Sequence, residues 1–138
     1  MTFTIVLPRP NPILSPNNKC HHFVKAKATA KARSAAYFHA CSWWGGITPP
    51  RWELATVRKL WIMPTWAHHP DPTNTDQWLK PTYDGICNDW GLMIDDRGLK
   101  PIWGDILVSK LFVDPRGDLW PKGCVVLTFE EWRPECGS

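Results

Sequence analysis

Acidic residues are almost absent from the first sixty positions of this chain, where Glu53 is the single carboxylate. The same segment carries nine lysine and arginine residues, so its formal charge is +8. Residues 61–138 contain twelve acidic and seven basic side chains, a formal charge of −5. This separation of charge favours a basic surface for a polyanion beside an acidic pocket for a cation, although a run of lysines is often only the solvated face of a helix.

Long apolar runs are also lacking. No stretch of about 18 consecutive apolar residues occurs, and residues 1–10 have neither the charged start nor the apolar centre of a signal peptide. We therefore expect a soluble cytoplasmic protein that does not associate with a membrane. The 138 residues, 43% of them hydrophobic, suffice for one core and predict a single domain over residues 1–138.

Cysteine pairs at the spacing of metal ligands are missing as well. The five cysteines are odd in number and widely spaced, and no CxxC motif occurs, which favours reduced thiols over a disulfide framework. Cys20 is followed by His21 and His22, but three adjacent side chains rarely reach one ion. A structural zinc site is therefore not expected.

Proline and glycine are absent from residues 21–44, an alanine-rich segment that a Gly-Gly pair closes, so a helix is expected from about residue 24 to 44. Residues 2–7 alternate in side-chain type before a proline, which predicts a strand. Further strands are expected at 52–63, 106–113 and 124–129, the last two joined across a long turn. This order predicts an α+β fold: a mixed or antiparallel sheet of about four strands with two main helices.

Residues 71–96 gather six of the 13 acidic residues of the chain and a single lysine. In the middle of this stretch, Leu79, Tyr83, Ile86 and Trp90 fall within about 60° of one another on a helical wheel, which predicts a helix with a narrow core-facing stripe. Thr75 is a suitable residue for its start and Gly91 for its end, and Pro81 should kink it.

The polar side of this helix carries a row of charges. Asp76, Lys80 and Asp84 are spaced four residues apart, which places them on one side of the helix next to the apolar stripe. Such a row is commonly a set of surface ion pairs. Asp71 precedes the helix, and the pair Asp95-Asp96 follows it.

These acids suggest a metal site if the chain returns past the start of the helix. Carboxylates that meet at short range are tolerated only with a cation or a bound proton. Oxygen ligands favour Mg²⁺ or Mn²⁺, and such an ion can activate water for hydrolysis of a phosphodiester. Lys80 would then contact the phosphate. The alternative is that Asp71 and the Asp95-Asp96 pair are ordinary turn residues.

The order of these residues resembles the central motif of the RusA family of Holliday junction resolvases. In that motif Asp-x-Asp-Asn is followed by a lysine, by Asp-Gly or Asp-Ala, by a glycine and by an Asp-Asp pair. The matching residues here are Asp71, Asn74, Lys80, Asp84-Gly85, Gly91 and Asp95-Asp96. The first strand with the LPRP sequence after it, the SPNN sequence at 15–18 and the basic segment 25–33 also resemble the opening of the family.

The resemblance implies a small homodimeric endonuclease that needs Mg²⁺ and nicks four-way DNA junctions symmetrically, in DNA recombination and repair and often in phages or prophages. It implies metal binding by Asp71, Asp95 and Asp96 and catalytic support from Lys80, with Asp76 as an additional acid. The DNA-contacting residues that it implies are Asn18, Lys19, Lys25, Lys27, Lys31 and Arg33.

The chain departs from the motif at one metal-binding position, because Thr73 stands where the family has its second Asp. A second register takes Asp76 as that Asp, with Lys80 four residues on, but it puts Asn74 at the first Asp. We prefer the Asp71 register because it also aligns Asn74 and the Asp84-Gly85 pair. In either register one acid is missing.

The missing acid leaves three hypotheses open. The first is an active junction endonuclease, and the second is a catalytically silent protein that binds branched DNA with the same fold. The third is a protein-interaction factor that uses the acidic helix. Most of the ten tryptophans are expected to pack in the core, and Trp43, Trp44 and Trp78 are the candidates for stacking on unpaired bases. The mode of dimerisation is left open, with the apolar segment 60–63 as the expected candidate for the interface.

Overall fold

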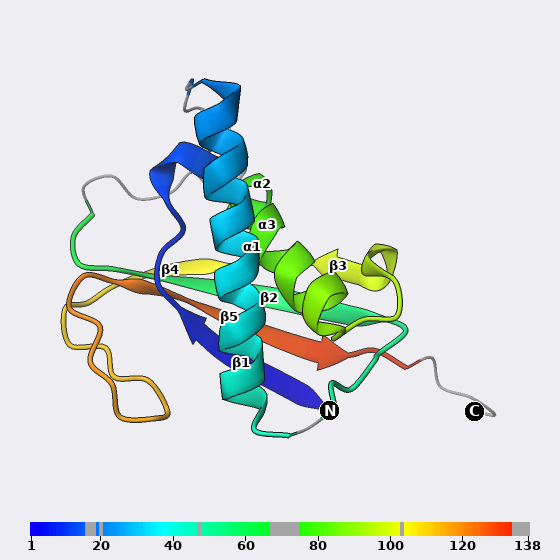
Figure 1. The fold of residues 1–138 in the computed structure, drawn as a ribbon. Helices are drawn as coiled ribbons and strands as arrows, with labels where there is room; N and C mark the ends of the chain where they lie inside the picture. The colour runs from blue at the N-terminus through cyan, green and yellow to red at the C-terminus, as the bar shows by residue number, and fades with distance from the viewer. Residues whose placement is uncertain (16–18, 20, 47, 67–74, 103, 134–138) are drawn as a thin grey trace.

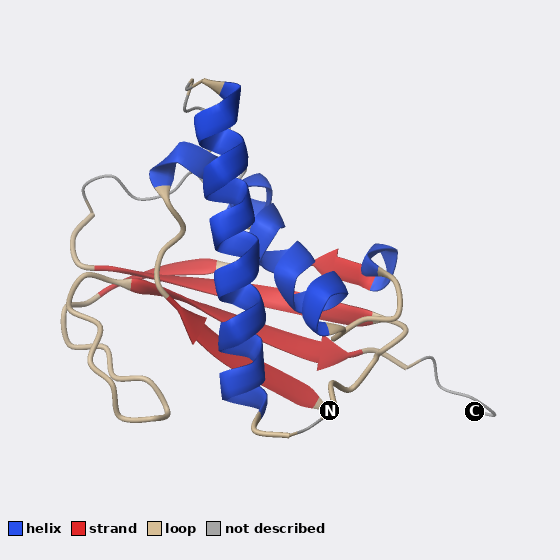
Figure 2. Cartoon of the chain, in the orientation of Figure 1, coloured by secondary structure: helices blue, strands red, loops and turns tan. Residues whose placement is uncertain are grey.

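A computed structural model of the chain describes residues 1–15, 19, 21–46, 48–66, 75–102 and 104–133. Five strands form one mixed sheet, and the helices cover one of its faces (Figures 1 and 2). The elements are β1 (Thr2–Leu7), η1 (Pro12–Leu14), α1 (His22–Trp44), β2 (Ala55–Met63), α2 (Thr75–Trp78), α3 (Lys80–Asp84), η2 (Gly85–Trp90), η3 (Asp96–Gly98), β3 (Leu99–Pro101), β4 (Asp105–Val108) and β5 (Cys124–Glu131).

The sheet runs in the order β1-β5-β2, with β3 and β4 one after the other along the outer edge of β2. β5 is antiparallel to β1 and to β2, whereas β3 and β4 are parallel to β2. The predicted α+β class with two main helices is therefore confirmed, and the sheet has five strands rather than about four. The second helix is an 11-residue unit made of α3 and the π-helical η2.

The predicted strand 106–113 was wrong in its second half, because β4 ends at Val108. β4 and β5 also do not form a hairpin, since they pair with opposite edges of β2. The alternating residues after Val108 belong to a loop instead. Phe112 and Trp120 of this loop pack on the sheet face away from the helices, and buried Asp114 accepts a hydrogen bond from the Trp120 indole at 2.8 Å.

The main core lies between the sheet and the helices. The predicted stripe of Leu79, Tyr83, Ile86 and Trp90 is confirmed, since none of the four is more than 9% exposed. Residues 61–63 of β2 are also buried, at 2% exposure or less. Because β2 has strands on both sides, the expectation that segment 60–63 forms a dimer interface was wrong.

Parallel pairing of β2 with β3 requires a long crossover connection, and the second helix provides it. The predicted helix is divided at Leu79 into α2 and this 11-residue unit, and Pro81 lies at the start of the unit, next to the predicted kink. It ends at Gly91, whose φ of 96° is favourable for glycine. The chain then returns along the edge of β2, which brings residues 96–101 to the polar side of the helix.

Gly85 lies where the second helix crosses α1, and a Cβ there would clash with the main-chain carbonyl oxygen of Arg33. We expect Gly85→Ala to lower the free energy of unfolding by about 1–3 kcal/mol, because the backbone carbonyl cannot move aside cheaply. Urea denaturation followed by tryptophan fluorescence measures this change. Ser34→Ala, an exposed position on α1, should change it by less than about 0.5 kcal/mol. Equal values for both variants would contradict the close crossing.

Within the described part of the chain, no helix is long and apolar enough to span a membrane.

Candidate active site

A cavity of about 270 Å³ lies between the second helix and the returning chain. Asp76, Lys80 and Asp84 line it from the helix, and Asp96 and β3 line it from the other side. The structure therefore brings together acids from both ends of the acidic stretch, as expected if the chain returns past the helix. We call this cavity, lined by Asp76, Gln77, Lys80, Tyr83, Asp84, Cys87, Asp96, Leu99 and Pro101, the acidic pocket.

Asp76 is held by two side chains from the core. Lys59 of β2, only 6% exposed at its side chain, forms an ion pair with Oδ1 of Asp76. The Tyr83 hydroxyl donates a hydrogen bond to the same oxygen at 3.3 Å. Burial, with a further contribution from Asp76, raises the pKa of Tyr83, so this hydroxyl remains protonated and able to donate.

Lys80 contacts Asp84 rather than Asp76, with Nζ 3.2 Å from Oδ1. The predicted row of three charges therefore includes one ion pair within the helix, and Asp76 pairs across to β2 instead. The Lys80 side chain is 68% exposed, whereas that of Asp84 is 20% exposed. An exposed ammonium at the rim of an acidic pocket is well placed to contact an anionic group of a substrate.

Asp96 is exposed, and Asn88 donates a hydrogen bond to its Oδ2 at 3.2 Å. Cys87 lines the pocket next to it and is fully buried. Burial, with further contributions from Asp96 and Asp84, raises the pKa of this thiol to about 12. Cys87 is therefore a neutral thiol at neutral pH, which argues against a role as nucleophile or thiolate ligand.

Asp95 does not line the acidic pocket, although it is adjacent to Asp96 in the sequence. Its carboxylate accepts hydrogen bonds from the side chain and main chain of Arg97, and these hold the pKa of Asp95 well below its usual range. The structure thus separates the two acids that sequence reasoning treated as one pair. Asp71, Thr73 and Asn74 lie outside the described residues.

The carboxylates that the structure describes suit a hard cation that takes only a few of its ligands from the protein. Among the residues that the structure describes, no three histidine, cysteine or acidic side chains form a group able to hold a metal ion. Mg²⁺ commonly uses only one or two carboxylates and fills its remaining positions with water and substrate oxygen. One or two of Asp76, Asp84 and Asp96 therefore fit such an ion, which when bound would supply an activated water and a Lewis acid.

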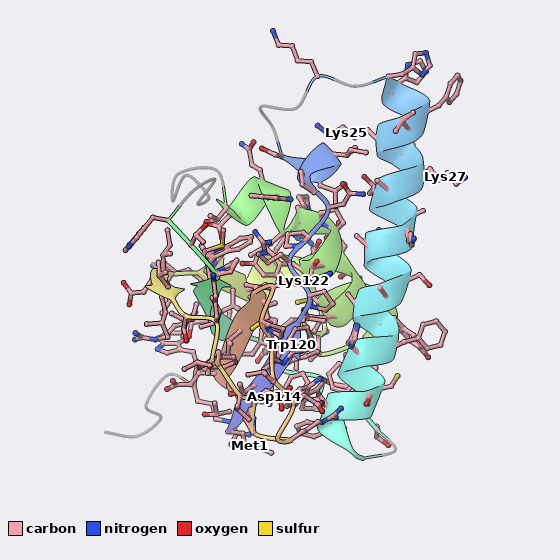
Figure 3. All side chains as sticks on the ribbon, turned by 90° about the vertical axis from the view of Figure 1, so that its left-hand side faces the viewer. Met1, Lys25, Lys27, Asp114, Trp120 and Lys122 are labelled. Atoms are coloured by element: carbon pink, nitrogen blue, oxygen red, sulfur yellow. The ribbon has the colours of Figure 1, made fainter. Side chains whose placement is uncertain are left out.

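The basic residues of α1 do not form one stripe. Lys25 and Lys27 lie on opposite sides of the N-terminal half of the helix (Figure 3), and Lys27 and Lys31 are exposed. Arg33 instead binds Asp89 through two hydrogen bonds of 2.6 and 2.8 Å, so these donors already have a protein partner. Of the other predicted DNA contacts, Lys19 is exposed, and Asn18 lies outside the described residues.

A second cavity, of about 500 Å³, lies between α1 and the proline-rich residues 8–12. Arg9, Lys31 and His39 are among its lining residues, and none of the described residues that line it is acidic. Thr82 of α3 also lines it, so this basic cavity and the acidic pocket lie on two sides of the same short helix. The arrangement places Arg9 and Lys31 on the other side of this helix from the acids of the pocket.

The tryptophans that are candidates for stacking on bases contact the rest of the protein. Trp43, Trp44 and Trp78 are only partly exposed and pack against the core. The Trp44 and Trp78 indoles donate hydrogen bonds of 2.9 Å to the main-chain oxygens of Thr48 and Asn11. These contacts favour a structural role for the three side chains.

Sequence reasoning missed Lys59 and Tyr83 as members of the site. It placed Lys59 among the surface charges and Tyr83 in the core stripe. One signal was available, because Lys59 has the same parity on its strand as the apolar residues Val57 and Trp61. A lysine on the buried face of a strand needs a polar partner, and the acidic stretch that follows this strand offers several.

Comparison of the chain with known proteins gives no matching family model and no matching curated protein. The resemblance to the RusA family therefore rests on the motif residues themselves, and function has to be argued from the geometry of the pocket.

Proposed function

We propose that this protein is a Mg²⁺-dependent, structure-selective endonuclease of the RusA type that cleaves four-way DNA junctions by paired symmetric hydrolysis of phosphodiesters. The observation that carries the proposal is the acidic pocket, in which Asp76, Asp84 and Asp96 lie together with the exposed Lys80. Phosphodiester hydrolysis needs acids to hold a cation and a positive group to stabilise the charge that develops on the phosphate.

The side chains of the pocket divide these tasks. Asp76 and Asp96 line the pocket from different segments, and we assign to them the binding of the ion and its water. Lys80 reaches outward from the rim and contacts a non-bridging phosphate oxygen of the bound strand. Asp84 holds the Lys80 ammonium near the pocket until the phosphate arrives.

The basic surface supplies binding rather than chemistry. Lys25, Lys27 and Lys31 contact the phosphate backbone, which makes binding strongly dependent on salt and largely independent of sequence. Paired nicks at symmetric positions require two such pockets on one branched substrate, which a homodimer provides. The reaction takes place in the cytoplasm, where the DNA substrate and free Mg²⁺ are both present.

A second candidate is a silent protein that binds branched DNA without cutting it. It is favoured by the absence, among the described residues, of three potential ligands close enough to hold a metal ion. The Thr at position 73, where the RusA motif has an acid, points the same way.

One experiment separates these candidates. A labelled four-way junction and a linear duplex of the same sequence are incubated with the protein in Mg²⁺, Mn²⁺ or EDTA and run on native and denaturing gels. We expect symmetric nicks that appear only in the junction and only with metal. A junction that is shifted but uncut in every metal would favour the silent protein. No shift and no cut would refute both candidates.

A further inference from the structure

Lys59 is a charged residue at a position that the fold reserves for apolar side chains. It lies on the helix-facing side of the central strand β2, between Val57 and Trp61, which are 0% and 2% exposed. A buried ammonium without a partner costs several kcal/mol, so such a residue needs a charged or strongly polar neighbour. Asp76 is that neighbour, and its side chain is 47% exposed toward the pocket.

The sheet is interrupted beside Lys59. Pairing along this edge of β2 stops at Val57 and Pro101, where β3 ends, and resumes at Leu60 and Asp105, where β4 begins. Gly104 packs so closely here that a Cβ would clash with the main-chain oxygen of Lys59. Gly104 therefore lies directly against Lys59 at this gap in the pairing.

The contacts of Asp76 are one-sided. Lys59 and Tyr83 both donate to Oδ1, so among the described residues Oδ2 is the oxygen that neither donor uses. A carboxylate anchored through one oxygen keeps a fixed orientation and presents the other to a ligand. Supporting contacts of this kind determine how well an acid can bind a cation.

The charges of the pocket nearly balance. Its three acids, Asp76, Asp84 and Asp96, face two lysines, because Lys59 pairs with the first and Lys80 with the second. Asp96 has the neutral Asn88 as its hydrogen-bond partner. Among the described residues of the pocket, Asp96 is therefore the acid that forms no ion pair, whereas a buried lysine offsets the charge of Asp76.

We propose that Lys59 is a positioning residue that orients Asp76 and offsets its charge, so that Asp76 holds a divalent ion in a fixed place but less tightly than a free carboxylate would. The effect on cutting rests on the proposed function, whereas the effect on ion binding does not.

The test is Lys59→Met, which keeps an unbranched side chain of similar length and removes the charge. Binding of Mn²⁺ is titrated by electron paramagnetic resonance, cutting of the junction is measured in parallel, and thermal unfolding reports on the fold. In the variant we expect about tenfold tighter Mn²⁺ binding, because Asp76 loses its counter-charge. We also expect an unchanged Tm, because the carboxylate that is left without a partner is 47% exposed and can be solvated.

Cutting by the variant should nevertheless fall about 100-fold, because Asp76 is no longer oriented. The matched control is Arg58→Met, which removes the same charge from the neighbouring exposed position on the other face of β2 and should change none of these values. A purely structural role of Lys59 would instead lower Tm, Mn²⁺ binding and cutting together.

Mn²⁺ binding by Lys59→Met that is no tighter than that of the wild type would overturn the inference. If neither protein cuts junctions but Mn²⁺ binding tightens in the variant, the proposed function fails while the role of Lys59 stands.

Discussion

Asp76→Asn is expected to lower the rate of junction cutting about 100- to 1,000-fold while junction binding stays unchanged. The side-chain oxygen of asparagine accepts hydrogen bonds from Lys59 and Tyr83 as Oδ1 of Asp76 does. The substitution therefore keeps the hydrogen-bond acceptor and removes the negative charge, both from the cation site and from beside the buried Lys59. Thermal unfolding is measured alongside, so that a loss of stability is told apart from a loss of chemistry. Single-turnover cleavage in Mg²⁺ measures the rate, and a gel shift in EDTA measures the binding.

Asp105→Asn is the matched control for this prediction. Asp105 is an exposed acid at the start of β4 and does not line the acidic pocket, so the same change of charge should leave cutting intact. If Asp76→Asn cut junctions at the wild-type rate, Asp76 would not belong to the reaction. The motif register that begins at Asp71 would then be the one that matters.

Local periodicity predicts the elements that carry the site. Strand β1, helix α1 and the stripe from Leu79 to Trp90 could be read from spacing alone, because their patterns repeat within a few residues. The same spacing placed Asp76, Lys80 and Asp84 on one side of a helix. Residues 109–113 misled the same reasoning, because Phe112 packs on the sheet from a loop, and side-chain alternation does not tell packing from strand pairing.

The contacts that complete the site depend on long-range register. Asp96 reaches the pocket because β3 pairs with the first residues of β2, and no local pattern states that pairing. Lys59 reaches Asp76 because the acidic helix crosses the same face of the sheet. Neither of these two contacts can be predicted from the spacing of residues within one segment.

Counting charges along the sequence separates a basic first part from an acidic second part, but it overestimates how many basic side chains are free on the surface. Lys59 and Arg33 both fall in the basic half of the sequence, yet each forms an ion pair with an acid from the other half. Lys27 and Lys31 are exposed on the same helix as Arg33, so they remain available for the proposed contacts with DNA. It does shift the expected contacts toward the N-terminal part of α1 and toward Arg9 and Lys31 in the basic cavity.

Asp96→Asn and Asp95→Asn should separate two neighbouring acids that sequence alone could not distinguish. Asp96 lines the acidic pocket with a neutral hydrogen-bond partner, so its loss should remove the charge available to a cation and lower cutting at least about 100-fold. Asp95 is occupied by Arg97 outside the pocket, so its substitution should leave cutting within about twofold of the wild type, since changes at exposed positions away from such features have small effects.

The pair is compared by single-turnover cleavage together with Mn²⁺ titration, because loss of an ion ligand should weaken both activity and metal binding in Asp96→Asn alone. Each variant loses one negative charge, and the two positions are adjacent. Non-specific electrostatic effects on DNA binding are therefore the same in both. Equal losses in both variants would show that the Asp95-Asp96 pair acts as a unit when DNA is bound. A loss in Asp95→Asn alone would mean that Arg97 releases its carboxylate to the substrate site, and the pocket described by Asp76 and Asp96 would then not be where the chemistry occurs.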